Sequence, residues 1–225
     1  PPRSTLFPYT TLFRSGRLTI AEKKRILLAH LHGVDIDPQA VEVTKLSLLT
    51  KMLENENGPS LKAQQELFHE RVLPDLDGNI KCGNSLIGSD FYGLDFEPGT
   101  EKKIKPFDWE KEYPAVFKAG GFDAVIGNPP YVRQEVLGSG FKKYAKQTFE
   151  TYGGTADLYV YFVEKSLSLI KQTGLYSIIV ANKWLRANYG MPLRRFLKKK
   201  RIYEIIDFGD LPVFKNATTY RSEER

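Results

Sequence analysis

The sequence contains few of the residues that build covalent or metal-bound scaffolds. Its 225 residues include one cysteine, Cys82, which excludes a disulfide framework and a thiolate metal site. The three histidines, His30, His32 and His69, lack the spacing of metal ligands, so we expect surface or packing roles for them. No apolar run reaches the length needed to span a membrane. These absences predict a globular protein of the cytoplasm, without a bound metal or a membrane partner.

The two ends of the chain do not resemble protein-coding sequence. Residues 1–15, PPRSTLFPYTTLFRS, back-translate without a break into a string that resembles a common short-read sequencing adapter, and residues 221–225, RSEER, resemble the opposite adapter. The alternative is a natural N-terminal segment of odd composition. Processing scars have to be set aside before a fold is argued. We expect 1–15 and 221–225 to be adapter-derived and only 16–220 to be native, cut off at both ends.

The charge balance is mildly basic. The whole chain carries +6, and residues 16–220 carry +4, because the flanking segments contribute four arginines and two glutamates. This balance permits nucleic-acid binding but does not establish it. The length of 16–220 suits one domain, or most of one, with a substantial core.

Helical and strand patterns alternate along the chain. Apolar spacing predicts helices at 20–29, 38–57, 156–171 and 184–201, and a polar helix-like stretch to about residue 72. Buried strands are predicted at 32–36, 79–82, 123–127, 175–181 and 202–208. Asp37 suits the N-cap of the second helix and Pro38 its first position. Residues 83–121 are rich in glycine, proline and charge, and predict a long excursion with little regular structure.

This alternation predicts an α/β fold, a Rossmann-like, mostly parallel sheet with helices on both faces. In such sheets ligands bind beyond the carboxyl ends of the strands. Candidate site residues are therefore those that directly follow a strand.

Asp35 ends the first predicted strand, in the run GVDIDP. A carboxylate there can accept hydrogen bonds from both hydroxyls of a ribose. The alternative is that Asp35 and Asp37 both cap the following helix, and the residues alone favour neither reading. We assign Asp37 to the cap and Asp35 to the ribose.

The strongest signal is the run Asn128, Pro129, Pro130 and Tyr131, directly after the strand DAVIG. The exocyclic nitrogen of adenine is a poor nucleophile because its lone pair is delocalised into the ring. The side-chain oxygen of Asn128 and the carbonyl oxygen of Pro129 can accept its two protons and localise that lone pair toward a methyl donor. The prolines stiffen the loop, and Tyr131 offers a face on which an extracted base can stack. A plain proline-rich turn is the alternative, which the position after a buried strand disfavours.

Six blocks, in order and spacing, resemble one enzyme family. They are GVDIDPQAV, IKCGNSLIG, FDAVIGNPPYVRQE, GGTADLYVYFVEKSLSLI, ANKWLRANYG and IDFGDLPVFKNATTY, and they span essentially all of 16–220. They are similar to the class I S-adenosylmethionine-dependent amino-methyltransferases, in the gamma group of DNA adenine-N6 methyltransferases. The similarity is strongest to the methyltransferase region of type IIG restriction–modification enzymes and of related phage-defence methyltransferases.

The resemblance implies roles for the cofactor candidates. Asp35, with Ile36 beside it, would bind the ribose of S-adenosyl-L-methionine. Asn84 stands where the family often has an aspartate that contacts the cofactor adenine, and an amide can both donate and accept there. Phe162 would pack near that adenine, or else belong to the core.

The resemblance also implies the reaction and the substrate. An adenine flipped out of double-stranded DNA would be clamped between Tyr131 and Phe214, whose alternative role is core packing. Its N6 amine would take the methyl group without a covalent enzyme intermediate. No activated cysteine is needed, so we expect Cys82 to pack. The implied setting is the prokaryotic cytoplasm.

Two parts of the family pattern lie outside this sequence. The glycine-rich loop that holds the methionine end of the cofactor would precede residue 16, and the target-recognition domain would follow residue 220. We expect 16–210 to be the catalytic domain without that loop, and 211–220 to lead toward target recognition. A nuclease would be fused or associated elsewhere. The chain alone is expected to bind cofactor weakly and to methylate nothing.

Basic side chains are consistent with contacts to DNA phosphates. One group follows the NPPY loop and a second crowds one predicted helix: Lys142, Lys143 and Lys146, then Arg194, Arg195 and residues 198–201. A solvated helix face is the alternative for the second group.

Other substrates are compatible with the same fold. Protein glutamine and RNA adenine are both methylated by enzymes with similar NPPY loops, whereas cytosine-N4 methylation is disfavoured by the asparagine at position 128. A rival from another class is a non-catalytic DNA-specificity subunit that keeps a dead methyltransferase fold. The intact loop argues against it.

Overall fold

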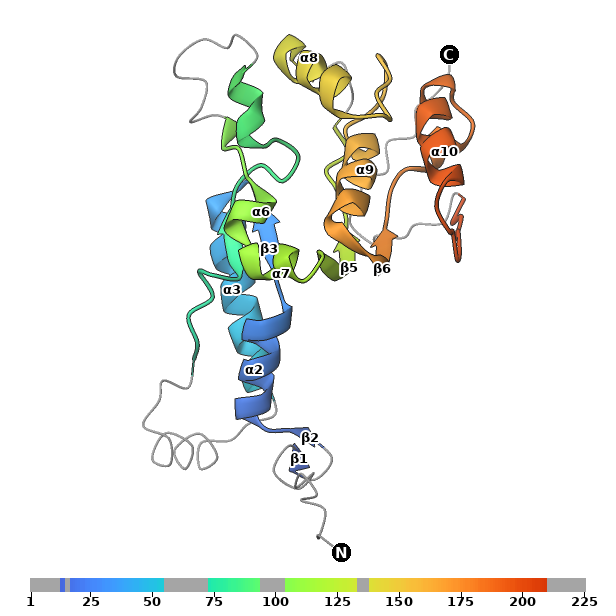
Figure 1. Ribbon diagram of the computed structural model, residues 1–225. Coiled ribbons are helices and arrows are strands. Elements are labelled where there is room, and N and C mark those ends of the chain that lie inside the picture. The colour runs from blue at the N-terminus through green and yellow to red at the C-terminus, as the bar shows by residue number, and fades with distance from the viewer. Residues whose placement is uncertain (1–12, 15–16, 55–72, 94–103, 133–137, 210–225) are drawn as a thin grey trace, which may run out of the picture. The chain divides into compact units, whose positions relative to one another are not determined.

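The computed structural model describes residues 13–14, 17–54, 73–93, 104–132 and 138–209 (Figure 1). The chain divides into two compact units, Pro1–Pro114 and Ala115–Arg225. Each unit has its own buried apolar residues. Among the described helices, none combines the length and the apolar character that a membrane crossing requires.

The first unit is built on a pair of parallel strands. β3 (Gly33–Asp35) pairs with β4 (Ile80–Cys82), with Asp35 opposite Cys82. Two helices lie side by side next to this pair, α2 (Ile20–His30) and α3 (Pro38–Leu53) (Figure 1). The short elements of this unit are β1 (Phe13–Arg14), β2 (Arg17–Leu18), η1 (Ser89–Gly93) and α6 (Trp109–Glu112).

Asn79 joins the helices of the first unit to its strands. Its buried amide donates to the carbonyl oxygens of Leu28 and Leu31, at 2.9 and 2.8 Å, where α2 ends. Its own carbonyl oxygen accepts the N–H of Gly33 at 2.9 Å and lies 2.8 Å from the hydroxyl of Tyr113. Burial raises the pKa of Tyr113 well above its ordinary value, so this hydroxyl stays a neutral donor. These bonds fix the end of α2 against β3 because leaving them unmade would be costly.

The second unit is also built on a parallel pair. β5 (Phe122–Gly127) pairs with β6 (Ile170–Ile178), with Gly127 opposite Ile178. α9 (Tyr159–Leu169) contacts both strands (Figure 1). The remaining elements are α7 (Pro114–Lys118), α8 (Ser139–Thr148), η3 (Asn182–Leu185), η4 (Asn188–Gly190) and α10 (Met191–Lys198). Buried residues of α8, α9 and α10 form the core, among them Tyr144, Tyr159, Val160, Leu193 and Phe196.

Several predicted elements are confirmed. The first helix is α2, the second begins with Asp37 as its N-cap and Pro38 in its first turn, and four predicted strands correspond to β3, β4, β5 and β6. Both described parallel pairs agree with the predicted α/β topology. The predicted polar stretch to about residue 72 lies outside the described residues.

Other predictions are wrong, for identifiable physical reasons. Residues 202–208 are exposed and form no strand, because no described strand pairs with them. β5 is a strand but is not buried, since Ile126 is 84% exposed. The excursion at 83–121 contains η1, α6 and α7, and α8 was not predicted at all.

The predicted helix at 184–201 is broken, and Pro192 explains where it restarts. Proline has no N–H to donate and suits the first turn, so α10 begins at Met191 after η3 and η4. Gly190 allows the close packing that precedes the restart. A β-carbon there would lie 2.0 Å from the carbonyl oxygen of Trp184.

We expect Gly190→Ala to lower the free energy of unfolding by about 1–3 kcal/mol, because rotation of a side chain cannot relieve a clash with backbone. Urea unfolding of the chain measures it. Gly154→Ala is the matched control: a β-carbon at Gly154 has no described atom within 4 Å, and the expected change is within about 0.5 kcal/mol. Equal losses in the two variants would contradict the close-packing account.

Candidate active site

The loop from Asn128 to Tyr131 directly follows β5, as the sequence predicted. Because β5 and β6 are parallel, their carboxyl ends lie at the same edge. The pairing continues one residue beyond β6, where the N–H of Ile179 donates to the carbonyl oxygen of Gly127 at 3.2 Å. The Tyr131 hydroxyl donates to the carbonyl oxygen of Ile179 at 3.4 Å. The chain is therefore attached to the end of β6 just before the loop, at Gly127, and at the last loop residue, Tyr131.

A second attachment runs from the loop to the start of α9. The N–H of Val132 donates to the carbonyl oxygen of Pro130, and the N–H of Leu158 donates to that of Val132, both at 3.0 Å. Pro129 is buried. Proline rings fix the backbone between these attachments, so the loop has little conformational freedom left to lose on binding.

The loop presents two hydrogen-bond acceptors that other described residues do not use. The exposed side chain of Asn128 makes no hydrogen bond within the described chain, and no described N–H donates to the carbonyl oxygen of Pro129. Tyr131 is 54% exposed, which leaves ring surface for stacking. Partial burial of its phenol raises the pKa of Tyr131, so the hydroxyl is neutral at physiological pH. Acceptors and aromatic surface thus occur within four consecutive residues.

The cofactor candidates Asp35 and Ile36 lie at the carboxyl end of β3, in the first unit. Oδ1 of Asp35 accepts the N–H of Asp37 at 2.8 Å, and Oδ1 of Asp37 accepts the N–H of Gln39 at 2.9 Å. The predicted cap at Asp37 is confirmed, and Asp35 also contributes to the turn with one oxygen. No described donor binds Oδ2 of Asp35, and the side chain is exposed.

Asn84 lies beside this turn because β4 is the neighbour of β3. The N–H of Gly83 donates to the carbonyl oxygen of Asp35 at 2.8 Å, and Asn84 follows. Oδ1 of Asn84 accepts the N–H of Leu86 at 3.1 Å, which leaves the amide group as a donor. The ends of β3 and β4 therefore carry two polar groups that face no described partner, Oδ2 of Asp35 and the amide N–H₂ of Asn84, together with the half-exposed side chain of Ile36. This donor set fits the hydroxyls, the ring nitrogens and the apolar face of an adenosine.

The other candidates differ in what the structure says of them. Phe162 is half-buried on α9, and Phe214 lies outside the described residues. Cys82 is exposed, so the expectation that it packs is wrong; its Sγ lies 3.6 Å from the carbonyl oxygen of Ile36. Sequence reasoning missed Lys105, whose ammonium reaches the same carbonyl at 3.1 Å. Nothing in the composition of 83–121 singles it out.

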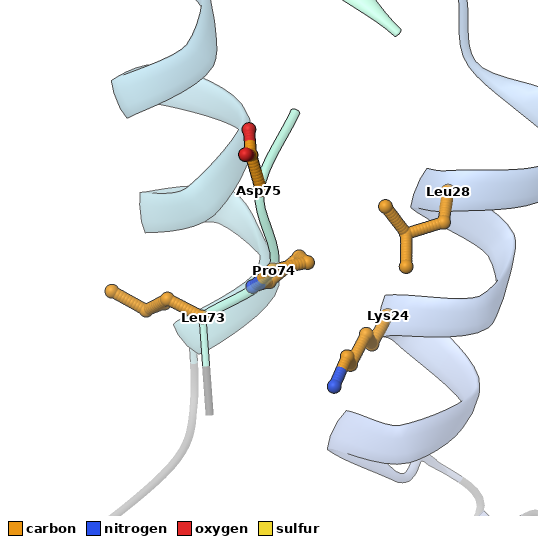
Figure 2. Close-up of a pocket in the computed structure, with 5 residues that line it drawn as sticks. All are labelled: Lys24, Leu28, Leu73, Pro74 and Asp75. Atoms are coloured by element: carbon orange, nitrogen blue, oxygen red, sulfur yellow. The ribbon is translucent and has the colours of Figure 1, made fainter. Parts of the chain in front are cut away.

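A cleft elsewhere in the first unit does not coincide with these residues. It lies between α2 and residues 73–75 and is lined by Lys24, Leu28, Leu73, Pro74 and Asp75 (Figure 2). Figure 2 shows Lys24 and Leu28 on α2 across from Pro74. None of the predicted site residues lines it. In the described part of the chain, no group of three or more His, Cys, Asp or Glu side chains could hold a metal ion.

Comparison with known proteins matches residues 29–214 to the Eco57I restriction-modification methylase family. The chain is 31% identical over 208 residues to the type II restriction enzyme and methyltransferase RM.Eco57I of Escherichia coli, which covers 91% of this chain and 19% of that protein. It is 34% identical over 112 residues to the type II methyltransferase M.BstVI of Geobacillus stearothermophilus, covering 49% of this chain and 19% of that protein.

A third relative is the type II methyltransferase M.PaeR7I of Pseudomonas aeruginosa, 35% identical over 98 residues, or 42% of this chain and 17% of that protein. The chain spans less than a fifth of the length of these three relatives. The matches confirm the predicted resemblance to restriction–modification methyltransferases. Together with the parallel strands and helices, they confirm the predicted fold class, that of class I S-adenosylmethionine-dependent methyltransferases.

Substitutions of Asp35, the last residue of β3, and of Asp37, two residues later, are expected to separate stability from ligand binding. Asp37→Ala should lower the free energy of unfolding by about 1 kcal/mol, because the N–H of Gln39 loses its acceptor. Asp35→Asn keeps an oxygen for the N–H of Asp37 and should change stability by less than about 0.5 kcal/mol. Only Asp35→Asn should weaken binding of S-adenosylmethionine, because it loses the charged acceptor for a ribose hydroxyl.

Urea unfolding and equilibrium dialysis with labelled S-adenosylmethionine measure the two effects. The dialysis uses the longer protein that carries this chain. Loss of cofactor affinity in Asp37→Ala equal to that in Asp35→Asn, at equal folded fractions, would contradict the assignment of Asp35.

Proposed function

The chain belongs to the Eco57I restriction-modification methylase family, and on that premise we propose that it is the catalytic part of a site-specific DNA methyltransferase acting on the N6 amine of adenine. One observation carries the proposal. The loop from Asn128 to Tyr131 holds two acceptors that no described residue uses and an exposed aromatic ring, at the carboxyl end of a parallel strand. The three relatives are named as type II methyltransferases, one of them also as a restriction enzyme. These names support the proposal that DNA is the substrate.

Asn128 and Pro129 would act on the amine directly. Oδ1 of Asn128 and the carbonyl oxygen of Pro129 would accept hydrogen bonds from the two N–H bonds of the adenine amine. These hydrogen bonds would draw the nitrogen lone pair out of conjugation with the ring. The nitrogen then acts as the nucleophile, gains the methyl group and releases a proton to solvent. S-adenosylmethionine, when bound, supplies that methyl group in electrophilic form. The residues contribute orientation and fixed dipoles, which require no reorganisation during the reaction.

The resemblance also implies roles in base stacking and in cofactor binding. Tyr131 and Phe214 would hold the flipped adenine between their rings. Asp35 would accept the ribose hydroxyls and Asn84 would donate to the cofactor adenine, with Ile36 against its face. Phe162 is half-buried on α9, and its role near the cofactor adenine is proposed from the resemblance alone.

The rest of the protein is inferred from its relatives. RM.Eco57I is named as both a restriction enzyme and a methyltransferase, which supports a fused or associated nuclease here. We further propose, from the same resemblance, that a target-recognition domain and a glycine-rich cofactor loop contribute to the working protein, which acts in the prokaryotic cytoplasm. Methylation of RNA adenine or protein glutamine, and a non-catalytic DNA-specificity role, are the alternatives that the following experiment separates.

The test is to incubate the longer protein with duplex DNA and methyl-labelled S-adenosylmethionine, digest the DNA and identify the labelled nucleoside. Label is expected in N6-methyladenine. Asn128→Ala should reduce the rate by about 100-fold or more, because one of the two dipoles that activate the amine is lost. Asn188→Ala, an exposed asparagine in η4, is the matched control and should keep the wild-type rate.

The alternatives give different results in the same assay. Label found only in added RNA, or only in added protein, would show that the substrate is RNA or protein and not DNA. Labelled DNA whose yield does not depend on Asn128 would contradict the role of the loop. Wild-type protein that binds DNA but transfers no label to any substrate would support the specificity subunit.

Exposed basic residues of α10 are proposed contacts to DNA phosphates. Leu193 and Phe196 are buried, and Arg194 donates to the carbonyl oxygens of Trp184 and Ala187, so these residues hold the helix in place. Arg195 and Lys198 are exposed and lie on one face of the helix, three residues apart.

Replacing Arg195 and Lys198 together by glutamine is expected to weaken DNA binding and to reduce the slope of log K against log salt by about 1–2, since each lost phosphate contact changes it by about 0.9. Binding titrations at several salt concentrations measure the slope. The control replaces two exposed lysines outside α10, Lys51 and Lys118, and so removes equal charge. If the two double variants have the same slope, Arg195 and Lys198 do not contact DNA phosphates, and the basic face of α10 is simply exposed to solvent.

A further inference from the structure

Lys105 adopts a backbone conformation that is unfavourable for its residue type. Its φ is 47°, and among the described residues it is the one non-glycine with a positive φ. The left-handed region is unfavourable for such a residue because its β-carbon comes too close to a backbone carbonyl oxygen. Strain of this kind persists where neighbouring contacts enforce it, and it is concentrated at functional sites.

Contacts on the C-terminal side of Lys105 enforce this conformation. Pro106 forms a bridge with Asn84, and the N–H of Phe107 donates to the carbonyl oxygen of Ile87 at 2.7 Å. The buried ring of Phe107 packs so closely on Gly83 that a β-carbon there would lie 2.6 Å from it. Phe107 also meets Trp109 edge to face, with ring centroids 5.2 Å apart. The segment after Lys105 is thus fixed to the end of β4.

Lys105 links the two strand ends that carry the cofactor candidates. Its ammonium donates to the carbonyl oxygen of Ile36 at 3.1 Å and lies 4.0 Å from Sγ of Cys82. Its own carbonyl oxygen accepts the N–H of Asn84 at 2.7 Å. One residue therefore binds the turn that holds Asp35 through its side chain, and the turn of Asn84 through its backbone.

We propose that Lys105 is a positioning residue of the cofactor site, which sets the separation between the Asp35–Ile36 turn and Asn84. This rests on the proposed function, in which those residues hold the adenosine of S-adenosylmethionine. Glycine at position 105 would relieve the strain but could not reach Ile36. Stability alone would favour glycine at position 105. A strained lysine there is explained if the hydrogen bond from its ammonium to Ile36 is needed for ligand binding.

The test compares Lys105→Gly, Lys105→Arg and Lys111→Met in the longer protein. Lys111 lies in the same segment and its ammonium binds Asp108, so Lys111→Met removes a cation without touching the cofactor candidates. The dissociation constant of S-adenosylmethionine is measured by equilibrium dialysis without DNA. KM for the cofactor, kcat and thermal stability are measured alongside it.

Lys105→Gly is expected to raise the dissociation constant and KM by about five- to tenfold, as for the loss of one hydrogen bond, while kcat changes by less than about twofold. Its thermal stability should equal or exceed that of the wild type, because the strain is relieved. Lys105→Arg, which keeps the cation, should recover most of the affinity. Lys111→Met should bind as the wild type does.

Unchanged cofactor affinity in Lys105→Gly would overturn the proposal, as would a loss that Lys105→Arg does not recover. Wild-type protein that binds S-adenosylmethionine but methylates no DNA would contradict the proposed function and leave this comparison of dissociation constants intact. Wild-type protein that does not bind the cofactor would overturn both.

Discussion

The proposed chemistry depends on the backbone of Ile179. Its N–H binds the carbonyl oxygen of Gly127 and its carbonyl oxygen accepts the hydroxyl of Tyr131, so one residue beyond β6 holds the loop at both ends. Both bonds use main-chain atoms of Ile179, and the two prolines stiffen the chain between them. The backbone at positions 128 and 129, with the acceptor carbonyl of Pro129, is therefore oriented before any base arrives. Acceptors fixed in this way need no reorganisation in the transition state, which is the main source of catalysis that this site can offer.

The ends of β3 and β4 follow a related arrangement in the first unit. Polar side chains there satisfy the local turn with part of their hydrogen-bonding capacity and keep the rest. Asp35 uses one carboxylate oxygen for the N–H of Asp37, and Asn84 uses its oxygen for the N–H of Leu86. As far as the described residues show, an acceptor remains at one strand end and a donor at the next. The choice between capping and ligand binding at Asp35 is thus not exclusive, because its two oxygens can do both.

Features decided by neighbours in sequence could be predicted, and features decided by distant contacts could not. The cap at Asp37, the start of α3 and the loop after β5 each follow from a few adjacent residues. Gly190 and Trp184 restrict the chain before α10 through a contact that no periodicity reveals. The apolar pattern at 202–208 predicted a strand, yet a strand requires a partner, and no described strand pairs with it. The role of Lys105 could not be predicted for the same reason, since it comes from hydrogen bonds to Ile36 and Asn84, which are distant in sequence. Phe214 stays a prediction from the resemblance alone.

The most direct measurement is a crystal structure of the longer protein with duplex DNA and an unreactive analogue of S-adenosylmethionine. The account predicts an adenine turned out of the helix and stacked on Tyr131. Its N6 atom should lie within about 2.7–3.2 Å of both Oδ1 of Asn128 and the carbonyl oxygen of Pro129. An adenine that stays paired in the duplex, or an amine bound by other groups while Asn128 faces solvent, would contradict the central claim.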